Sequence, residues 1–340
     1  MWTAAVMSAI VLMAPAALGQ EENAMAARRC DAYTAVQVPA EAQSVVTPKV
    51  APGCASYRSY RGIGRPVNYA ETRACAWKER AAQKAELGQN GKEPTAWVIG
   101  GSLILADIYF NGAGVAVNRP LAMRFACEAE ESMAELAMDH LAKAGSPSDA
   151  KKPFEFCDYS VTTFTMNFCS SYKAQVQDDQ RDREYRRLAS AMPPDQRVAF
   201  ETLLSAERAY LGTHASEVYQ GGSIHNIRTR SSQNILDDLF HGELMQLKRK
   251  HGPALSQAQV AGANLLEETE RAKAIQRINA QPKDEANEDI TADGFAKAQA
   301  AWEAYRTAWV VFARLLYPEH AAAVRAEITL DRYRLLKTIP

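Results

Sequence analysis

Carboxylates and arginines alternate densely in one stretch of this chain, and such spacing could support acid–base catalysis. The carboxylates are Asp178, Asp179, Asp182 and Glu184. Two carboxylates held close together can act as a general acid and a general base. Arginines interleave them, at Arg181, Arg183, Arg186 and Arg187. Opposite charges three and four positions apart form ion pairs on a solvated helix face, so we interpret this stretch as structural.

A second candidate is Ser223, which follows Gly222 and precedes His225 by two residues. A serine beside a histidine could supply a nucleophile and its base. The flanking Gly-x-Ser-x-Gly elbow is missing, however, and no third member of a triad is identifiable. We interpret the segment as a turn followed by a helix cap. With no other catalytic signature in the sequence, we expect a protein that is not an enzyme and has no catalytic residues.

Metal and cofactor sites are not expected. The sequence has no Cys-x-x-Cys, and its six histidines are scattered, so the usual ligand spacing of a zinc site is missing. Two Gly-x-Gly segments resemble the start of a dinucleotide-binding fingerprint. Neither has the third glycine, and helix-like sequence precedes the second copy. We therefore predict no metal and no cofactor.

Six cysteines lie in the first half of the chain, at Cys30, Cys54, Cys75, Cys127, Cys157 and Cys169. An even number behind an apolar amino terminus predicts three disulfides in an exported protein, although six cysteines allow 15 connectivities. We predict the pairs Cys30–Cys54, Cys75–Cys127 and Cys157–Cys169. The last pair requires a turn between its cysteines, because on one straight helix they would lie about 18 Å apart. The alternative is six buried thiols in a cytosolic protein.

The amino terminus predicts export. Residues 1–19 form an uncharged apolar run that ends in small residues, with Ala17 and Gly19 at the positions before a cleavage site. The run is too short to span a bilayer comfortably, and Pro15 interrupts it. No Lys or Arg precedes it, so an uncleaved anchor or a buried helix is the alternative. We predict a periplasmic or secreted protein, associated with the membrane only if the signal is uncleaved.

The composition predicts an all-α protein without a nucleic-acid partner. The chain has 340 residues, 47% of them hydrophobic, and a formal net charge of −1. This charge gives no general attraction to nucleic acid or to an anionic membrane. Ala, Leu, Glu, Arg and Gln dominate the longer segments, and these residues favour helices. We expect short antiparallel helix-pair repeats followed by a helical bundle of long charged helices.

One segment occurs twice and divides the first half of the chain. Gly62-Ile-Gly64-Arg-Pro-Val-Asn68 returns as Gly112-Ala-Gly114-Val-Ala-Val-Asn118. The first glycine of each copy can end a helix in the left-handed conformation, and the second permits a sharp turn. The asparagine can then cap the next helix. We assign residues 20–58 to an extended, disulfide-tethered leader and residues 59–148 to helical repeats.

The second copy resembles a SEL-one-like repeat. It reads Leu105-Ala-Asp-Ile-Tyr109-Phe-Asn-Gly112-Ala-Gly114-Val115, with Asn118 and Ala122 following. In that family a helix ends in Tyr-x-x-Gly-x-Gly-Val, and its partner begins at Asp or Asn with Ala four residues on. The first copy is similar but has Thr72 in place of the alanine. The resemblance implies antiparallel helix pairs that serve as a protein-interaction scaffold.

Residues 154–340 resemble a second family, after a boundary near Lys151-Lys-Pro153. Gln299, Trp302, Tyr305 and Arg306 fall within about two helical turns. This pattern is similar to the helix signature of the LprI-type lysozyme-inhibitor family. The match extends to Ile328–Leu336 and to Cys157 and Cys169 followed by Asp178–Tyr185. The family's cysteine after this signature is replaced here by Phe312 and Arg314. Two degenerate copies, 154–230 and 231–340, or one long unit could fill this region.

Helices are expected throughout both halves, at about 69–87, 120–131, 132–143, 175–190, 196–210, 233–250, 254–279, 295–316 and 320–337. We interpret Trp302 and Tyr305 as a core stripe rather than a binding surface, and favour a structural role for Arg306 in a buried ion pair. The acidic segment Asp284–Asp289 is a solvated linker, or alternatively steers a cationic protein.

Together these features predict a non-catalytic, exported protein-binding protein of the cell envelope. The second resemblance makes a lysozyme or related muramidase a candidate partner. The main alternative is a structural or assembly scaffold of the periplasm without inhibitory activity. An envelope hydrolase is a third, less favoured hypothesis.

Overall fold

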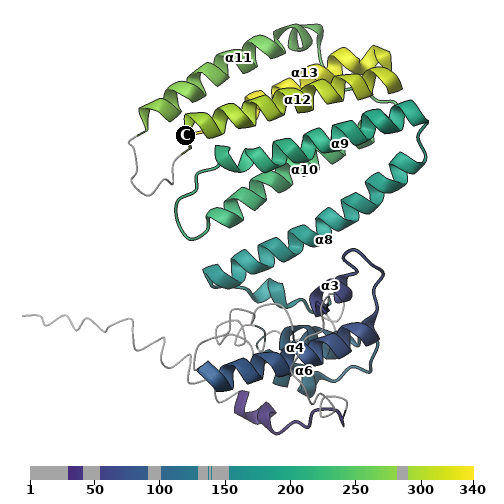
Figure 1. The fold of residues 1–340 in the computed structure, drawn as a ribbon, viewed down its shortest axis with the longest axis vertical. Coiled ribbons are helices and arrows are strands. Elements are labelled where there is room, and N and C mark those ends of the chain that lie inside the picture. Colours follow the sequence, from purple (N-terminus) through teal and green to yellow (C-terminus); the bar gives the residue numbers. More distant parts are fainter. Residues whose placement is uncertain are drawn as a thin grey trace, which may run out of the picture. The chain divides into compact units, whose positions relative to one another are not determined.

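The computed structural model describes residues 30–40, 54–90, 101–128, 137, 139, 153–281 and 290–340. Within these residues the chain is helical and contains no strand, which confirms the predicted all-α class (Figure 1). The predicted signal 1–19, most of the helix 132–143 and the acidic segment 284–289 lie outside the described residues.

The chain divides into two compact units, Met1–Cys169 and Ser170–Pro340. We call them unit 1 and unit 2. The division falls within the long helix α8, Thr163–Ser190, whereas the sequence places the boundary near residue 153.

The described residues of unit 1 include two helix pairs. Helix α3 (Ser56–Arg61) packs against α4 (Tyr69–Asn90), and α5 (Ser102–Asn111) packs against α6 (Arg119–Ala126). Helix α4 also packs against α5, so the pairs stack. A short 3-10 helix, η1 (Phe156–Tyr159), precedes α8.

Part of the leader that the sequence predicts to be extended is helical. Residues 30–34 are helical, and α3 begins at Ser56, before the predicted repeat boundary. The Arg124 side chain donates a hydrogen bond to the carbonyl oxygen of Val36, so α6 holds this segment by more than its disulfide. Helix α4 continues through Gly88, because one glycine costs a long helix only about 1 kcal/mol.

An aromatic cluster forms the core of unit 1. The ring of Trp77 lies 5.2 Å from that of Phe125 and 6.4 Å from that of Tyr109, measured between centroids. Arg80 covers the cluster, with its guanidinium 5.3 Å from the Phe125 ring, and forms an ion pair with Glu128. One aromatic side chain from each of α4, α5 and α6 therefore joins the two helix pairs.

The repeated turns have the geometry that the sequence predicts. Gly62 and Gly112 end α3 and α5 in the left-handed conformation, with φ of 70° and 69°. Asn118 caps α6 by accepting a hydrogen bond from the backbone nitrogen of Leu121 at 3.1 Å. Asn68 accepts from the backbone nitrogen of Glu71 at 3.2 Å. Gly64 also has a positive φ, of 74°.

Gly114 is the least replaceable of these glycines. Its φ is +68°, and a Cβ atom there would lie 2.7 Å from the Cβ of Tyr69, at the start of α4. We expect Gly114→Ala to destabilise unit 1 by at least the ~1–2 kcal/mol that a left-handed alanine costs, measured by denaturant unfolding. Gly212→Ala is the control, because Gly212 lies within a helix and an added Cβ meets nothing within 4 Å. An equal stability for both variants would contradict the close approach.

All six cysteines form disulfides, as predicted, but two of the three predicted pairs are wrong. The observed pairs are Cys30–Cys127, Cys54–Cys75 and Cys157–Cys169. Cys54 lies directly before α3, and α3 packs on α4, which carries Cys75. This leaves Cys127, at the end of α6, for Cys30. The third pair is confirmed, and the required turn lies between η1 and α8.

Unit 2 is a bundle of long helices. After α8 come α9 (Pro194–His214), α10 (His225–Lys248), α11 (Gln257–Ala280), α12 (Ala292–Leu316) and α13 (Ala321–Leu336), with the short helices η2 (Ala215–Glu217) and η3 (Pro318–His320) between them. Helix α9 packs along α12, and α11 packs along α13. Helices α8 and α10 begin well before the predicted residues 175 and 233, because their first turns lack the charge alternation used to find them.

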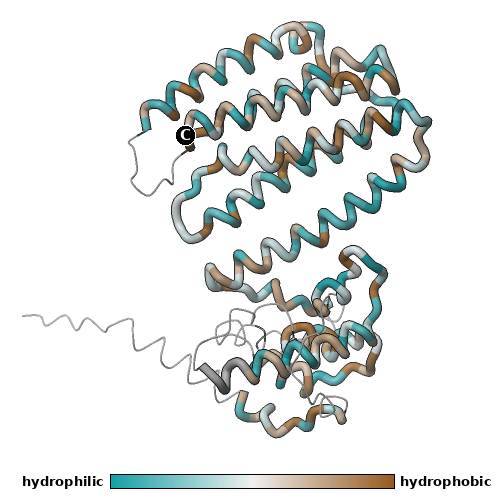
Figure 2. The backbone as a smooth tube through the Cα atoms, viewed as in Figure 1, coloured by the Kyte–Doolittle hydropathy of each residue, from teal (hydrophilic) through white to brown (hydrophobic). Residues whose placement is uncertain are grey.

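The core of unit 2 is aromatic. Trp309, Phe200, Phe240 and Phe312 are completely buried among the apolar faces of these helices. Figure 2 shows the alternation of hydrophobic and hydrophilic positions along them. No described helix combines the length and apolar character needed to cross a bilayer.

Candidate functional site

The predicted signature of α12 lies on the inner face of that helix. Trp302 and Tyr305 are buried in the unit 2 core, and the Tyr305 ring stacks on Tyr210 of α9 at 5.6 Å. Arg306 is half-buried and places its guanidinium 4.5 Å from the centre of the Trp302 ring. It therefore contacts an aromatic face instead of the predicted ion-pair partner. These residues position α12 in the bundle.

Gln299, the remaining residue of the signature, belongs to a buried polar network around Arg332. The Gln299 Oε1 atom accepts from Arg332 Nε at 3.2 Å and from Nη2 at 2.9 Å. Arg332 also donates to both carboxylate oxygens of Glu217, at 2.8 and 2.5 Å, and to the Tyr210 hydroxyl at 3.1 Å. All five N–H donors of the guanidinium are thus used.

The positive and negative charges of this buried network compensate each other. Burial alone would raise the pKa of Glu217, but the hydrogen bonds from Arg332 and His214 lower it below its usual value. Burial raises the pKa of Tyr210 to about 12, against the opposing charge of Arg332. Glu217 is therefore an ionised partner for Arg332, and the pair fixes α13 against η2.

One edge of this network has the connectivity of a catalytic triad. The Nε2 atom of His214 lies 2.7 Å from Ser232 Oγ, and its Nδ1 atom lies 3.0 Å from Glu217 Oε2. Sequence reasoning missed it, because Ser232 and His214 lie on different helices. Ser232 lies inside α10, where neighbouring backbone N–H groups serve the helix. The backbone donors that stabilise an oxyanion are thus not offered at Ser232.

The carboxylates of α8 form ion pairs, and Ser223 lies in a turn. Arg183 pairs with Asp179 within α8, Arg181 reaches Asp237 of α10 at 3.1 Å, and Arg208 of α9 reaches Asp182 at 2.8 Å. The charged face of α8 thus pairs with α9 and α10 as well as with itself. At Ser223, the predicted turn is present: His225 Nδ1 lies 3.0 Å from the carbonyl oxygen of Gly222.

The outer face of α12 forms an apolar groove with α9. Its walls carry Val198, Thr202, Ala206, Ala304, Val311 and Leu315, and its volume is about 790 Å³. Val198 is 63% exposed, Val311 47% and Leu315 45%. The charged side chains that line it are both acidic, Asp195 and Glu303. We call this feature the α9–α12 groove.

A second hollow lies on the other side of α12, against α11. It has a volume of about 560 Å³, and its apolar wall includes Ile275, Ala296 and Ala300. Glu303 lines both hollows. The outer face of α12 is therefore flanked on both sides by apolar surface.

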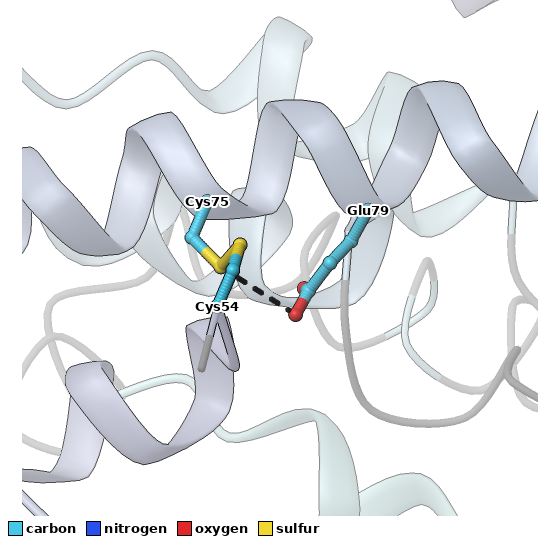
Figure 3. A group of neighbouring side chains, drawn as sticks. All are labelled: Cys54, Cys75 and Glu79. Atoms are coloured by element: carbon cyan, nitrogen blue, oxygen red, sulfur yellow. Dashed lines mark hydrogen bonds between the residues drawn. A yellow bond between two sulfur atoms is a disulfide. The ribbon is translucent and has the colours of Figure 1, made fainter. Parts of the chain in front are cut away.

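In unit 1, one set of side chains has the composition of a metal site. Cys54, Cys75 and Glu79 place their sulfur and oxygen atoms within 4.8 Å of one another (Figure 3). Both sulfurs are bonded in a disulfide and offer no thiolate. Glu79 accepts from the backbone nitrogens of Ser56 at 3.0 Å and Gly101 at 2.9 Å, at the starts of α3 and α5. The set therefore connects three helices.

Comparison with protein-family models, with curated proteins and with solved structures finds no match to this chain. The two family resemblances thus stay expectations from the sequence.

Proposed function

We propose that this chain is a non-catalytic, exported protein-binding protein of the cell envelope. The observation that carries the proposal is the α9–α12 groove, an apolar surface whose largest side chains are exposed. Exposed contiguous apolar surface with a polar rim is typical of interaction sites. The three disulfides support an oxidising compartment.

The lining of the groove favours an amphipathic helix with basic ends as its occupant. Helices α9 and α12 are antiparallel, because Gln196 contacts the carbonyl oxygen of Leu315 and Ser216 contacts that of Gly294. Asp195 therefore lies near one end of the groove, and Glu303 lies near Ala206 toward the other. Eleven helical residues separate the levels of Asp195 and Ala206, or roughly 16 Å. A three-turn helix with a Lys or Arg at each end matches this spacing.

A synthetic helix tests this proposal. We expect a three-turn peptide with an Ala/Leu face and a lysine at each end to bind the mature protein, and its glutamate-ended counterpart to bind at least roughly ten-fold more weakly. Val311→Asp and Leu315→Asp should abolish binding, measured by fluorescence anisotropy. Leu265→Asp is the matched control, since Leu265 is 69% exposed on α11 and lines neither hollow. Equal binding by all variants would reject the groove.

A lysozyme is the candidate partner, because it is cationic and acts in the same compartment. Adding mature protein to lysozyme that is digesting cell walls should slow lysis, and the Val311→Asp variant should slow it less. Unchanged lysis at micromolar excess would remove the inhibitor hypothesis. The alternative, a periplasmic scaffold without inhibitory activity, would then be favoured.

Export and disulfide formation can be tested together. We expect the intact mass of protein recovered from the periplasm to lack residues 1–19 and to increase by six hydrogens on reduction, since three disulfides consume six thiol protons. Six free thiols in the recovered protein would contradict the proposed location.

A further inference from the structure

Unit 2 contains a small cavity between α9, α10, α12 and α13. Its polar lining includes the carboxyl groups of Glu207, Glu243 and Asp331, and its aromatic lining consists of Tyr210, Trp302 and Tyr305. The cavity volume is about 30 Å³. Since one water needs roughly 10–15 Å³ by this measure, the cavity has room for about two waters.

Arg332 lines the same cavity but cannot neutralise these carboxyl groups. Its five donors are all committed to Glu217, Gln299 and Tyr210. Its guanidinium also lies 5.8 Å from the Tyr210 ring centre and 5.7 Å from that of Trp302. Arg332 therefore has no hydrogen-bond donor left for the carboxyl groups of the cavity.

Two glutamates of the cavity each face an aspartate, and each of these aspartates pairs with an arginine. Asp237 pairs with Arg181, and Asp331 pairs with Arg334. Glu207 has Asp237 as its hydrogen-bonding neighbour, and Glu243 has Asp331. Two ionised carboxylates have no proton with which to form a hydrogen bond. Glu207 and Glu243 therefore each need either a proton or a neighbouring cation.

Burial further disfavours the ionised form of both glutamates. Glu207 is only 5% exposed, and the Oε2 atom of Glu243 is fully buried. Burial, followed by the facing Asp237, raises the pKa of Glu207 to about 9, against Arg208 and Arg181. Burial, Asp331 and Glu327 raise the pKa of Glu243 well above its usual value, against Arg334. Without a ligand, burial and the facing aspartates therefore favour the protonated form of both glutamates.

The cavity shares lining residues with a neighbouring cleft. Glu207 and Leu211 line both the cavity and a larger cleft of about 300 Å³ formed with α8 and α10. The cleft is polar and contains the ion-paired side chains of Asp178, Arg181 and Arg230. The rest of an unbranched ligand held in the cavity would therefore be directed past Glu207 toward this cleft.

We propose that this cavity binds the primary ammonium group of an unbranched amine, with Glu207 and Glu243 as its carboxylate partners. An ammonium is compact and has three donors, and it matches a space of about two waters. A guanidinium is larger and planar. Within the described residues, these carboxylates do not bring three ligand atoms within 4.8 Å of one another, so the site is not arranged for a divalent metal, which needs more oxygen ligands.

Amine binding at this site changes the number of protons that the protein holds. The ammonium enters with its own charge, and each glutamic acid that pairs with it must lose its proton to solvent. Amine binding therefore releases protons and strengthens as the pH rises toward the pKa of the glutamates, while the amine stays protonated. A buried carboxyl pair that only supports the fold releases no proton on addition of an amine.

Calorimetry of the full-length mature protein with cadaverine, a linear diamine, tests the site. Near pH 8 we expect binding, a buffer-dependent heat that reports proton release, and no binding of the linear diol of equal length. Glu207→Gln and Glu243→Gln should each weaken binding roughly ten-fold or more. Both variants should fold, because an amide has the shape and neutrality of the protonated acid that burial favours in the free protein. Glu201→Gln, on the exposed side of α9, is the control.

Three results with cadaverine would overturn the proposal. They are no binding of cadaverine at millimolar concentration, equal binding by wild type and the Glu207→Gln/Glu243→Gln double variant, and binding without proton release. Tight binding of calcium or magnesium ions that the same double variant loses would replace the ammonium with a metal and would also reject it.

Discussion

Replacing Arg332 with methionine is expected to destabilise unit 2 by about 3–5 kcal/mol. Arg332 is almost completely buried, and its loss leaves the Glu217 carboxylate buried without its bidentate partner. It also removes donors from Tyr210 and Gln299. Since a domain is stable by only about 5–15 kcal/mol, the effect should be obvious in denaturant unfolding.

Two further variants separate the lost ion pair from lost packing. The double variant Arg332→Met/Glu217→Gln should recover much of the stability, because it removes the uncompensated charge. Arg334→Met is the matched control: it lies two residues away on α13, is well exposed, and its ion pairs contribute less than about 1 kcal/mol. Equal losses for Arg332→Met and Arg334→Met would show that the buried network contributes little.

The pH dependence of the Arg332→Met variant provides an independent measurement. In the wild type, Arg332 and His214 overcome the effect of burial and lower the pKa of Glu217. This contribution to stability is present above the unfolded-state pKa and is lost as the pH falls. Without Arg332, the effect of burial on Glu217 is largely uncompensated, so stability should decrease as the pH rises. The contribution of Glu217 to the pH slope, taken as the difference between the variant and the wild type, should therefore change sign.

Local features of the fold could be predicted from the sequence. A left-handed helix end favours glycine, and a helix start favours asparagine, so the spacing of Gly112, Gly114 and Asn118 determines the turn. The inner face of α12 was predictable for a similar reason, because Trp302 and Tyr305 lie on one side of a helix. These inferences need only the residues within a few turns.

Features that join distant segments could not be predicted. Cys30 and Cys127 are 97 residues apart, and their pairing depends on which helix ends meet. Arg332 and Glu217 are 115 residues apart and, taken singly, have the polarity of surface residues. Their burial follows from the packing of α13 and η2 against α12, which helical periodicity does not specify. The same holds for Glu207 and Glu243 around the cavity.

Asp107 should make the stability of unit 1 decrease as the pH rises. It lies on α5 and is almost completely buried, with its Oδ1 atom unpartnered. Burial raises its pKa to about 8, although Arg61 and the backbone of Phe156 oppose the shift. The folded state thus holds a proton that the unfolded chain releases at much lower pH. Stability is therefore highest below the unfolded-state pKa, near 4, and decreases until about pH 8.

Asp107→Asn should remove this dependence. The amide needs no proton, and its oxygen can still accept from the backbone of Phe156. At one pKa unit per 1.36 kcal/mol, the variant should exceed the wild type at pH 8 by several kcal/mol, with about 5 kcal/mol as the upper bound. The two should converge near pH 4.

Hydrogen exchange of the α5 amides between pH 5 and 8, corrected for the intrinsic rate, isolates unit 1 from unit 2. Glu71→Gln is the control, because Glu71 is exposed on α4 and pairs with Arg65 at the surface. The control should keep the wild-type slope. If Asp107→Asn also keeps it, the proton lost with rising pH is held by another group. If the slope disappears only in Asp107→Asn, a single buried carboxyl group limits the stability of the repeat unit at neutral pH.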